Sequence, residues 1–263
     1  GINNDGNLEK ALTLCRAAKS AGADYVKLQK KTPRLCIPEA RWNDPKETPW
    51  GEVLPYLEYK ERMEFGRSEF NTIDQECQRI GLPWFASAWD LPSLEFLLAY
   101  DPPWLKIPSA CLTDLPLLEA CRQSGKPIVA STGMSTEAQI DGAVKALGPD
   151  RLVLLHCTST YPCPTEELNL STIGWLRDRF RVPIGYSGHH PGIWDGLCAA
   201  VLGACIVEKH FTLDRSSFGS DHSASLEPGG FARMTRYIRQ WEAARGDGVK
   251  KVYKSELPVM VRL

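Results

Sequence analysis

The chain has 263 residues, of which 43% are hydrophobic and 24% are charged, and its formal net charge is −1. These values are typical of a single enzyme-sized globular domain with a sizeable core. The near-neutral charge, without a run of like charges, argues against nucleic acid or a membrane surface as a partner. The nine cysteines form no CxxC pair, so we expect reduced thiols in a cytoplasmic protein.

Apolar runs of strand length alternate with helical periodicity along the chain. Apolar residues spaced by three or four predict helices over Leu8–Ala18 and Leu115–Cys121. Gly22 and Gly125 follow these segments as stop signals. The expected strands lie at Tyr25–Gln29, Trp84–Ala86, Trp104–Ile107, Pro127–Ala130, Leu152–Leu155, Pro183–Tyr186 and Cys205–Glu208.

This alternation predicts an α/β fold of the (β/α)8 TIM-barrel type. Gly1–Asn3 is interpreted as the end of a first strand whose beginning is missing, which brings the expected βα units to eight. Eight such units favour a closed parallel barrel. No GxGxxG turn follows a strand, so a dinucleotide-binding doubly wound sheet is disfavoured.

Two segments fall outside the alternation. Residues 31–64 are rich in Pro, Trp, Tyr and charge without sustained periodicity, and they predict a long functional loop over the mouth of the barrel. Residues 246–263 contain a turn at Asp247-Gly248 and are interpreted as a linker or tail. The barrel domain is therefore assigned to residues 1–245.

Polar side chains follow the expected strands, where a TIM barrel places its chemistry. A phosphate requires positive charge and several short donors, including backbone N–H groups such as those of Ser131–Gly133. The strand ends therefore predict an anion site. Its candidate residues are Lys27, Gln29, Ser87, Lys106, Ser109, Ser131, Thr132, Thr158, Ser159, Tyr161 and Ser187.

His189 and His210 follow neighbouring strands at equivalent positions, with Ser187 and Glu208 beside them. Two imidazoles leave coordination positions open for water and substrate, as a Lewis-acid metal site requires. Such ligands suit Mn²⁺, Co²⁺, Fe²⁺ or Zn²⁺ better than Ca²⁺. The alternative ligands are His190 and His222, the latter in a small-residue loop, 219–225, that can fold over the mouth.

Eight stretches together match one known family, in family order and through nearly the whole chain. They are Ile2-Asn3 with Asp5-Gly6, Val26–Lys30, Lys106-Ile107 with Ser109, Ser131–Met134, His156–Ser159 with Tyr161-Pro162, Ile184–His189, Glu208–Asp214 and Gly219–Pro228. With these stretches the chain resembles the sialic acid synthase family. The resemblance implies a metal-dependent transferase that condenses phosphoenolpyruvate with N-acetylmannosamine, or a related acetamido sugar, to give N-acetylneuraminate and phosphate.

The resemblance also implies roles for individual residues. His189 and His210 would hold the metal, most commonly Mn²⁺, with Mg²⁺ or Co²⁺ as alternatives. The residues implied for phosphoenolpyruvate are Lys27, Ser87, Lys106, Ser109, Ser131 and Ser187. The residues implied for the sugar are Asp5, Gln29, Tyr161, Glu208 and Asp221, and Ser159 stands among them where some members have Asn. Catalytic roles are implied for Asp5, Lys106, Glu208 and His210, with Asp5 or Glu208 positioning water or a sugar hydroxyl.

The chain departs from the family pattern at three places. Asn4-Asp5 stands where the family has His followed by Asn, Gln or Glu, and Pro108 replaces a glycine. The family's C-terminal antifreeze-like domain, which reaches across a homodimer, would begin where the chain stops. The resemblance thus implies a homodimer whose antifreeze-like domain lies outside this chain.

Three alternatives to an N-acetylmannosamine synthase remain. Few basic residues remain for a second phosphate, and the Asp5 carboxylate can only accept hydrogen bonds, so a neutral, hydroxyl-rich acceptor is expected. The nearest alternative is a condensing enzyme of the same mechanistic class that acts on an aldose phosphate, or on a diacetamido sugar as in a synthase of the legionaminic or pseudaminic type. A non-catalytic barrel and a metal-independent Schiff-base aldolase using Lys27 or Lys106 are the more distant alternatives.

Overall fold

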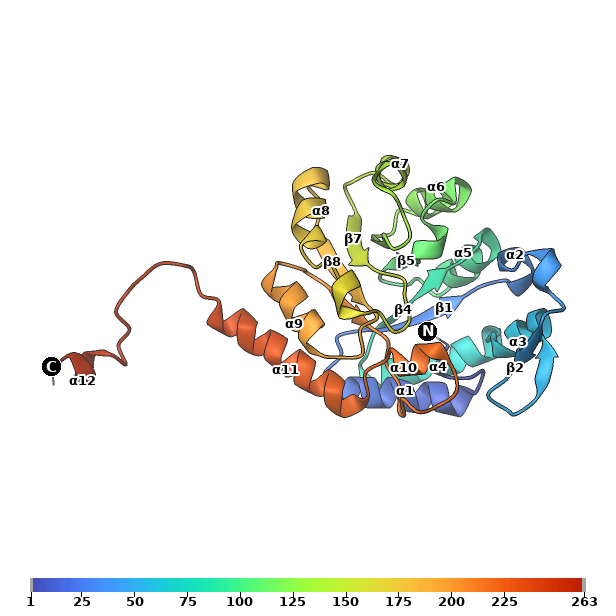
Figure 1. The fold of residues 1–263 in the computed structure, drawn as a ribbon, viewed down its shortest axis with the longest axis horizontal. Coiled ribbons are helices and arrows are strands. Elements are labelled where there is room, and N and C mark those ends of the chain that lie inside the picture. The colour runs from blue at the N-terminus through green and yellow to red at the C-terminus, as the bar shows by residue number, and fades with distance from the viewer. Residues whose placement is uncertain (1, 262–263) are drawn as a thin grey trace.

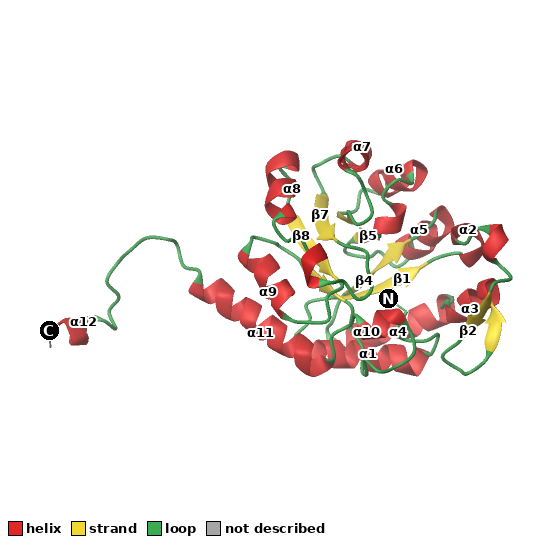
Figure 2. Ribbon diagram, viewed as in Figure 1, coloured by secondary structure: helices red, strands yellow, loops and turns green. Residues whose placement is uncertain are grey.

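The computed structural model describes residues 2–261, which form an α/β fold (Figure 1). Within these residues, seven strands form a curled parallel sheet in which each strand pairs with the next along the chain. Figure 2 shows this sheet with helices packed around it. The strands are β1 (Val26–Lys30), β4 (Trp84–Ala88), β5 (Leu105–Ile107), β6 (Ile128–Ser131), β7 (Leu152–Cys157), β8 (Ile184–Gly188) and β9 (Val207–Lys209).

Helices return the chain between the parallel strands. Asn7, Asp90 and Asp114 begin three of them by accepting a hydrogen bond from the backbone N–H three residues later. Gly22 and Gly125 follow two of them with φ of 87° and 76°, which confirms both expected stops. The helices are α1 (Leu8–Ser20), α4 (Arg67–Ile80), α5 (Leu91–Leu98), α6 (Leu115–Gln123), α7 (Glu137–Leu147), α8 (Thr172–Phe180), α9 (Trp194–Val201) and α11 (Pro228–Ala244).

The sheet is buried on both faces. Every residue of β6, β7 and β8 is buried, as expected for parallel strands covered by helices. Val129, Val153 and Leu155 pack together as a small cluster of their own. The larger core shared with the helices takes up Ile128, Ala130, Leu152, Leu154, Ile184 and Tyr186 of these strands. This packing fixes the strand ends, which carry the polar side chains.

The sheet curls as a barrel does, but within residues 2–261 no hydrogen-bonded ladder joins β1 to β9. A cavity of about 1100 Å³ reaches Val26 and Lys27 of β1 and Val207 and Glu208 of β9. The strand expected at residues 1–3 is wrong for the described part, because Ile2 is irregular and Asn3 begins a turn. Gly1 lies outside the described residues.

Residues 31–64 contain more regular structure than the sequence predicts. They form α2 (Pro33–Cys36), the 3-10 turn η1 (Glu39–Arg41), an antiparallel hairpin of β2 (Pro45–Glu47) and β3 (Val53–Pro55), and α3 (Tyr56–Met63). The lack of sustained periodicity therefore does not mean that this segment lacks regular structure. These elements are too short for periodicity to reveal, since even α3 buries only three side chains. The segment joining β1 to α4 is called the long connection below.

The remaining elements are short. They are η2 (Ser109–Cys111), η3 (Thr165–Glu167), α10 (Ser220–Ser223) and α12 (Leu257–Met260). Residues 246–261 are exposed and lead away from the sheet and its helices (Figure 1). Among residues 2–261, no helix has both the length and the apolar character needed to cross a membrane.

Candidate active site

The predicted site residues come together at the carboxyl ends of the strands. The pairing of β1, β4 and β5 sets Ser87 beside both Gln29 and Lys106. The pairing of β8 with β9 sets Ser187 beside Glu208. Ser87 and Ser187 are buried, and the Ser87 hydroxyl accepts a hydrogen bond from the Trp89 indole at 3.3 Å.

A buried ammonium group lies at the centre of the predicted anion site. Lys106 is only 2% exposed, and its Nζ donates to Ser131 Oγ at 2.6 Å and to the Ile107 carbonyl at 3.0 Å. Burial lowers the pKa of Lys106 to about 8, although the charge of Glu208 opposes this shift. A buried cation held by neutral groups favours binding of an anion, which would repay its desolvation.

Gly133 lies in another part of the predicted anion site, next to Ser109. Its N–H donates to Ser109 Oγ at 3.1 Å. A methyl group at Gly133 would come within 2.3 Å of Ser159 Oγ and 3.2 Å of Cys157 Sγ, so only glycine lets these side chains converge. Burial raises the pKa of Cys157, but the hydrogen bond to His189 and other polar neighbours outweigh it and lower the pKa. The sequence analysis missed Cys157, whose only signal is its place at the end of β7.

Lys27 and Glu208 face each other across the cavity between β1 and β9. Lys27 Nζ lies 3.2 Å from Glu208 Oε1. Burial raises the pKa of Glu208, but the ammonium groups of Lys27 and Lys106 outweigh it and lower the pKa to about 2. Glu208 is therefore ionised at neutral pH and serves as a hydrogen-bond acceptor rather than a proton donor.

His189 and His210 lie together, with ring centroids 5.3 Å apart. The Tyr161 ring stacks on His189 at 4.0 Å and meets His210 edge-on at 5.5 Å. His189 Nδ1 donates to the Thr158 carbonyl at 2.7 Å, and His210 Nδ1 lies 3.4 Å from Asp221 Oδ2. Within residues 2–261, neither Nε2 atom has a hydrogen-bond partner, and metal-binding imidazoles are commonly oriented in this way.

The residues around this pair fit a metal with open positions. Burial lowers the pKa of His210 well below its usual range, so its imidazole is neutral and able to bind a metal. Among residues 2–261, no group of three or more His, Cys, Asp or Glu side chains could hold a metal ion. Protein ligation would therefore stop at two imidazoles and leave room for substrate oxygen atoms.

The alternative ligands are engaged elsewhere. His190 Nδ1 accepts the Gly192 N–H at 2.9 Å. His222 is buried, and its Nδ1 lies 2.7 Å from Thr212 Oγ1. Because the Thr212 hydroxyl donates to the Asp214 carbonyl, it accepts from His222 Nδ1, and His222 Nε2 faces Asp5 at 3.4 Å.

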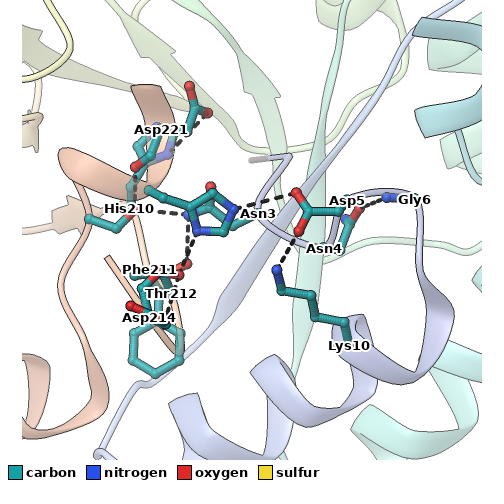
Figure 3. A network of polar contacts seen from close by, with 12 residues as sticks. Asn3, Asn4, Asp5, Gly6, Lys10, His210, Phe211, Thr212, Asp214 and Asp221 are labelled. Carbon is teal, nitrogen blue, oxygen red and sulfur yellow. Dashed lines mark hydrogen bonds and ion pairs between the residues drawn. The ribbon is translucent and has the colours of Figure 1, made fainter. Parts of the chain in front are cut away.

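Asp5 contacts both Lys10 and His222, and Figure 3 shows its contact with Lys10. Its carboxylate pairs with Lys10 on one side and faces His222 on the other. Burial raises the pKa of Asp5, but hydrogen bonds from His222 and Lys10 outweigh it and lower the pKa. The carboxylate therefore ties the N-terminal segment to the loop of residues 219–225, and the expectation that it serves the sugar does not follow from its contacts.

Asn3 also connects the N-terminal segment to the loop of residues 219–225. Its amide donates to the Phe211 carbonyl at 2.9 Å and to Ser225 Oγ at 2.8 Å. Asn3 is 4% exposed, and its Oδ1 has no hydrogen-bond partner among the described residues. The loop carrying Asp221 is thus held against the site, as the sequence predicts for residues 219–225.

A buried ion pair lies beside the backbone segments that carry the two histidines. Lys209 and Asp195 have fully buried side chains, and Lys209 Nζ lies 2.8 Å from Asp195 Oδ2. Lys209 also donates to the His190 carbonyl at 2.6 Å, and Tyr186 donates to Asp195 at 2.8 Å. The sequence analysis missed this pair because its members lie on β9 and α9, 14 residues apart.

Comparison with known proteins identifies the family of the chain. Residues 14–250 match the model of the NeuB family. The chain is 37% identical to N,N'-diacetyllegionaminic acid synthase of Campylobacter jejuni over 97% of the chain and 78% of that protein. It is 36% identical to human N-acetylneuraminate-9-phosphate synthase over 98% of the chain and 72% of that protein.

A solved structure extends the likeness to the fold. The crystal structure of the N-acetylneuraminic acid (sialic acid) synthetase of Leptospira borgpetersenii, a complex with citrate, superposes with a TM-score of 0.87 at 30% identity. The match covers 100% of this chain and 88% of that one. The chain therefore belongs to the NeuB family and is an enzyme of its synthase type, a transferase that forms carbon–carbon bonds.

Proposed function

We propose that the chain condenses phosphoenolpyruvate with the aldehyde of an open-chain N-acetylated amino sugar, with N-acetylmannosamine as the parent acceptor. The observation that carries this proposal is the buried contact of 2.6 Å between Lys106 and Ser131. It lies at the same edge of the sheet as the two imidazoles, where the parallel strands end. It supplies an anion site beside a place for a carbonyl-polarising metal. A Schiff-base aldolase would need neither the hydroxyls nor the paired imidazoles.

Different residues of the chain would bind the two substrates. Lys27, Lys106, Ser109 and Ser131 would bind the phosphate and carboxylate of phosphoenolpyruvate, since two cations and short hydroxyls surround one anion. Ser87 and Ser187, buried beside them, would complete this shell. Glu208, Tyr161, Ser159, Gln29 and Asp221 would face the sugar. The ionised Glu208 would orient a water molecule or a sugar hydroxyl.

A divalent metal, Mn²⁺ or otherwise Mg²⁺ or Co²⁺, would be held by Nε2 of His189 and His210 and would polarise the acceptor's aldehyde oxygen. The methylene carbon of phosphoenolpyruvate then bonds to the aldehyde carbon. Water adds to the adjacent carbon, which carries the carboxylate and the phosphate ester. Phosphate leaves by cleavage of the C–O bond between that carbon and the ester oxygen. The Tyr161 ring, stacked on His189, shields this place from bulk water.

The acceptor is the finer part of the proposal. The Campylobacter relative is named for a diacetyl sugar acid and the human relative for a 9-phosphate, so these two relatives differ in their products. Carboxylates accept hydrogen bonds from hydroxyls, and Glu208 and Asp221 both stand at the mouth, which favours a hydroxyl-rich sugar. A preference of roughly tenfold in kcat/KM for a diacetamido sugar would overturn this choice but not the reaction class.

We also propose that the sheet closes as a (β/α)8 barrel. An eighth parallel strand would fill the cavity of about 1100 Å³ between β1 and β9 and pair with both edges.

The reaction is tested by measuring phosphate release from phosphoenolpyruvate with a panel of acetamido sugars. Release should require both substrates and a divalent metal, and Lys106→Ala should raise KM for phosphoenolpyruvate by about ten- to a hundredfold. Metal-independent release without any sugar would contradict the proposal.

A further inference from the structure

Three serine hydroxyls of the predicted anion site each accept a hydrogen bond from an N–H group of the chain. The donors are the Lys106 ammonium for Ser131 at 2.6 Å, the Gly133 N–H for Ser109 at 3.1 Å and the Trp89 indole N–H for Ser87 at 3.3 Å. Lys106 and Gly133 already belong to the site. Trp89 follows β4 and has no role in the reaction as described so far.

The Ser87 hydroxyl faces the anion site with its proton unused. Ser87 pairs in register with Lys106 across β4 and β5, so the two side chains leave the same face of the sheet. Ser87 is only 1% exposed, and within residues 2–261 its hydroxyl has no acceptor for its own proton. A hydroxyl has one proton to donate, and a buried donor without an acceptor is unfavourable. An anion bound by Lys106 would supply that acceptor.

Trp89 is itself held in place by the neighbouring backbone. It lies two residues after Ser87 in extended chain, so both side chains leave the same face of the sheet. Its N–H donates to the Lys30 carbonyl at 3.2 Å, and the Asp90 carboxylate beside it accepts from the Thr32 N–H at 2.6 Å. The Lys31 ammonium lies 4.8 Å from the centre of the indole ring. The indole N–H is therefore oriented before any ligand arrives, which lowers the entropy lost on binding.

We propose that Trp89 is a positioning residue of the anion site, whose indole N–H fixes the Ser87 hydroxyl as a hydrogen-bond donor to phosphoenolpyruvate. The bond from the indole occupies a lone pair of Ser87 Oγ and turns the hydroxyl proton away from the ring. Trp89 acts through Ser87 and does not touch the substrate. The inference rests on the proposed function for the identity of the anion.

The test begins with Trp89→Phe, which keeps an aromatic ring and removes the N–H. Calorimetric titration with phosphoenolpyruvate should show an affinity about two- to tenfold weaker than that of the wild type, as expected for one neutral hydrogen bond. KM for phosphoenolpyruvate should rise by the same factor while kcat stays within about twofold, because the contact is made equally before and during the reaction. Wild-type affinity in Trp89→Phe overturns the proposal.

A double-mutant cycle separates this role from simple packing of the ring. Ser87→Ala should weaken phosphoenolpyruvate binding at least as much as Trp89→Phe does. In the Ser87→Ala background, Trp89→Phe should have no further effect, because the hydroxyl through which Trp89 acts is gone. Losses that add in the double variant contradict the proposal, since Trp89 would then act without Ser87.

Trp84→Phe is the matched control. Trp84 also lies on β4, but its indole N–H donates to Asp74 on α4 at 2.7 Å. The variant loses the same kind of hydrogen bond and should bind phosphoenolpyruvate as the wild type does. An equal loss of affinity in Trp84→Phe would show a general effect of indole removal and overturn the specific role of Trp89.

Two further outcomes are covered by the same titration. If Trp89→Phe does not fold, benzothienylalanine at position 89 keeps the fused ring without the N–H, and it should show the same two- to tenfold loss. Unchanged affinity in that protein overturns the proposal. If no sugar yields product, the proposed condensation fails, but phosphoenolpyruvate binding still decides the role of Trp89. A wild type that binds no phosphoenolpyruvate overturns both.

Discussion

Lys106 shows how burial tunes one side chain at this site. Its ammonium is held by one hydroxyl and one carbonyl, and no carboxylate lies within ion-pair distance of it in the described chain. Lys27, by contrast, pairs with Glu208 at 3.2 Å. The two lysines that would share one substrate thus differ in their partners, since only Lys27 has a carboxylate within ion-pair distance.

A pH profile follows from the pKa of Lys106, which burial lowers to about 8. Below that pH the ammonium is charged and binds phosphoenolpyruvate, and above it the neutral amine loses the charge-assisted contact. KM for phosphoenolpyruvate should therefore rise as pH increases through about 8 in the free enzyme. Lys106→Arg, whose charge persists, should flatten this rise, whereas Lys126→Gln, which removes a lysine paired with Asp101, should keep the wild-type profile. A profile of Lys106→Arg identical to that of the wild type would remove Lys106 from this role.

The histidine pair yields a second prediction at this scale. His189→Ala and His210→Ala should each weaken Mn²⁺ binding by about ten- to a hundredfold or more, since each removes one of two protein ligands. His190→Gln is the control, because the His190 ring is turned to Gly192 and Thr165. Metal content is measured by elemental analysis after dialysis. Unchanged manganese in a double His189→Ala, His210→Ala variant would refute the assignment.

At the scale of elements, β8, β9 and α9 are joined by the buried contacts of Lys209, Asp195 and Tyr186. The Lys209 ammonium also holds the His190 carbonyl, next to His189. The backbone that presents one imidazole is thus fixed by residues that do not touch the substrate site. Lys209 is a positioning residue in this account.

Lys209→Met should lower the free energy of unfolding by about 3–5 kcal/mol, because it leaves the Asp195 carboxylate buried without its partner. It should also weaken Mn²⁺ binding by loosening the His189 segment. The double variant Lys209→Met, Asp195→Leu should recover part of the stability but not the metal affinity. Arg179→Gln, which breaks a surface pair with Asp141, should leave Tm close to the wild type. If Lys209→Met binds Mn²⁺ as tightly as the wild type, Lys209 does not position His189.

The strand ends could be predicted from sequence because apolar runs locate each parallel strand to within a few residues. That placement suffices to bring Lys106, Ser131, His189 and His210 to one mouth. The short helix α3 and its Lys60 could not be predicted, since a helix of eight residues shows little periodicity. Contacts between segments that are distant in sequence, such as the contacts of Asp5, could not be predicted either.

At the scale of the whole molecule, two regions border the site. One is the gap between the edge strands β1 and β9, and the other is the long connection. The cavity at the edge reaches Lys27 and Glu208 from one side. The long connection begins directly after β1, where Lys31 lies over the Trp89 ring. The family model spans residues 14–250 and so includes both regions.

The central claim is tested most directly by mass spectrometry of the metal-loaded protein with an acetamido sugar and phosphoenolpyruvate carrying oxygen-18 in its bridging position. The account predicts a product with the mass of sugar plus phosphoenolpyruvate plus water minus phosphate, and the label in the released phosphate. Metal chelation should abolish both signals. Release of pyruvate alone, or label retained in the organic product, would contradict condensation with C–O cleavage at this site.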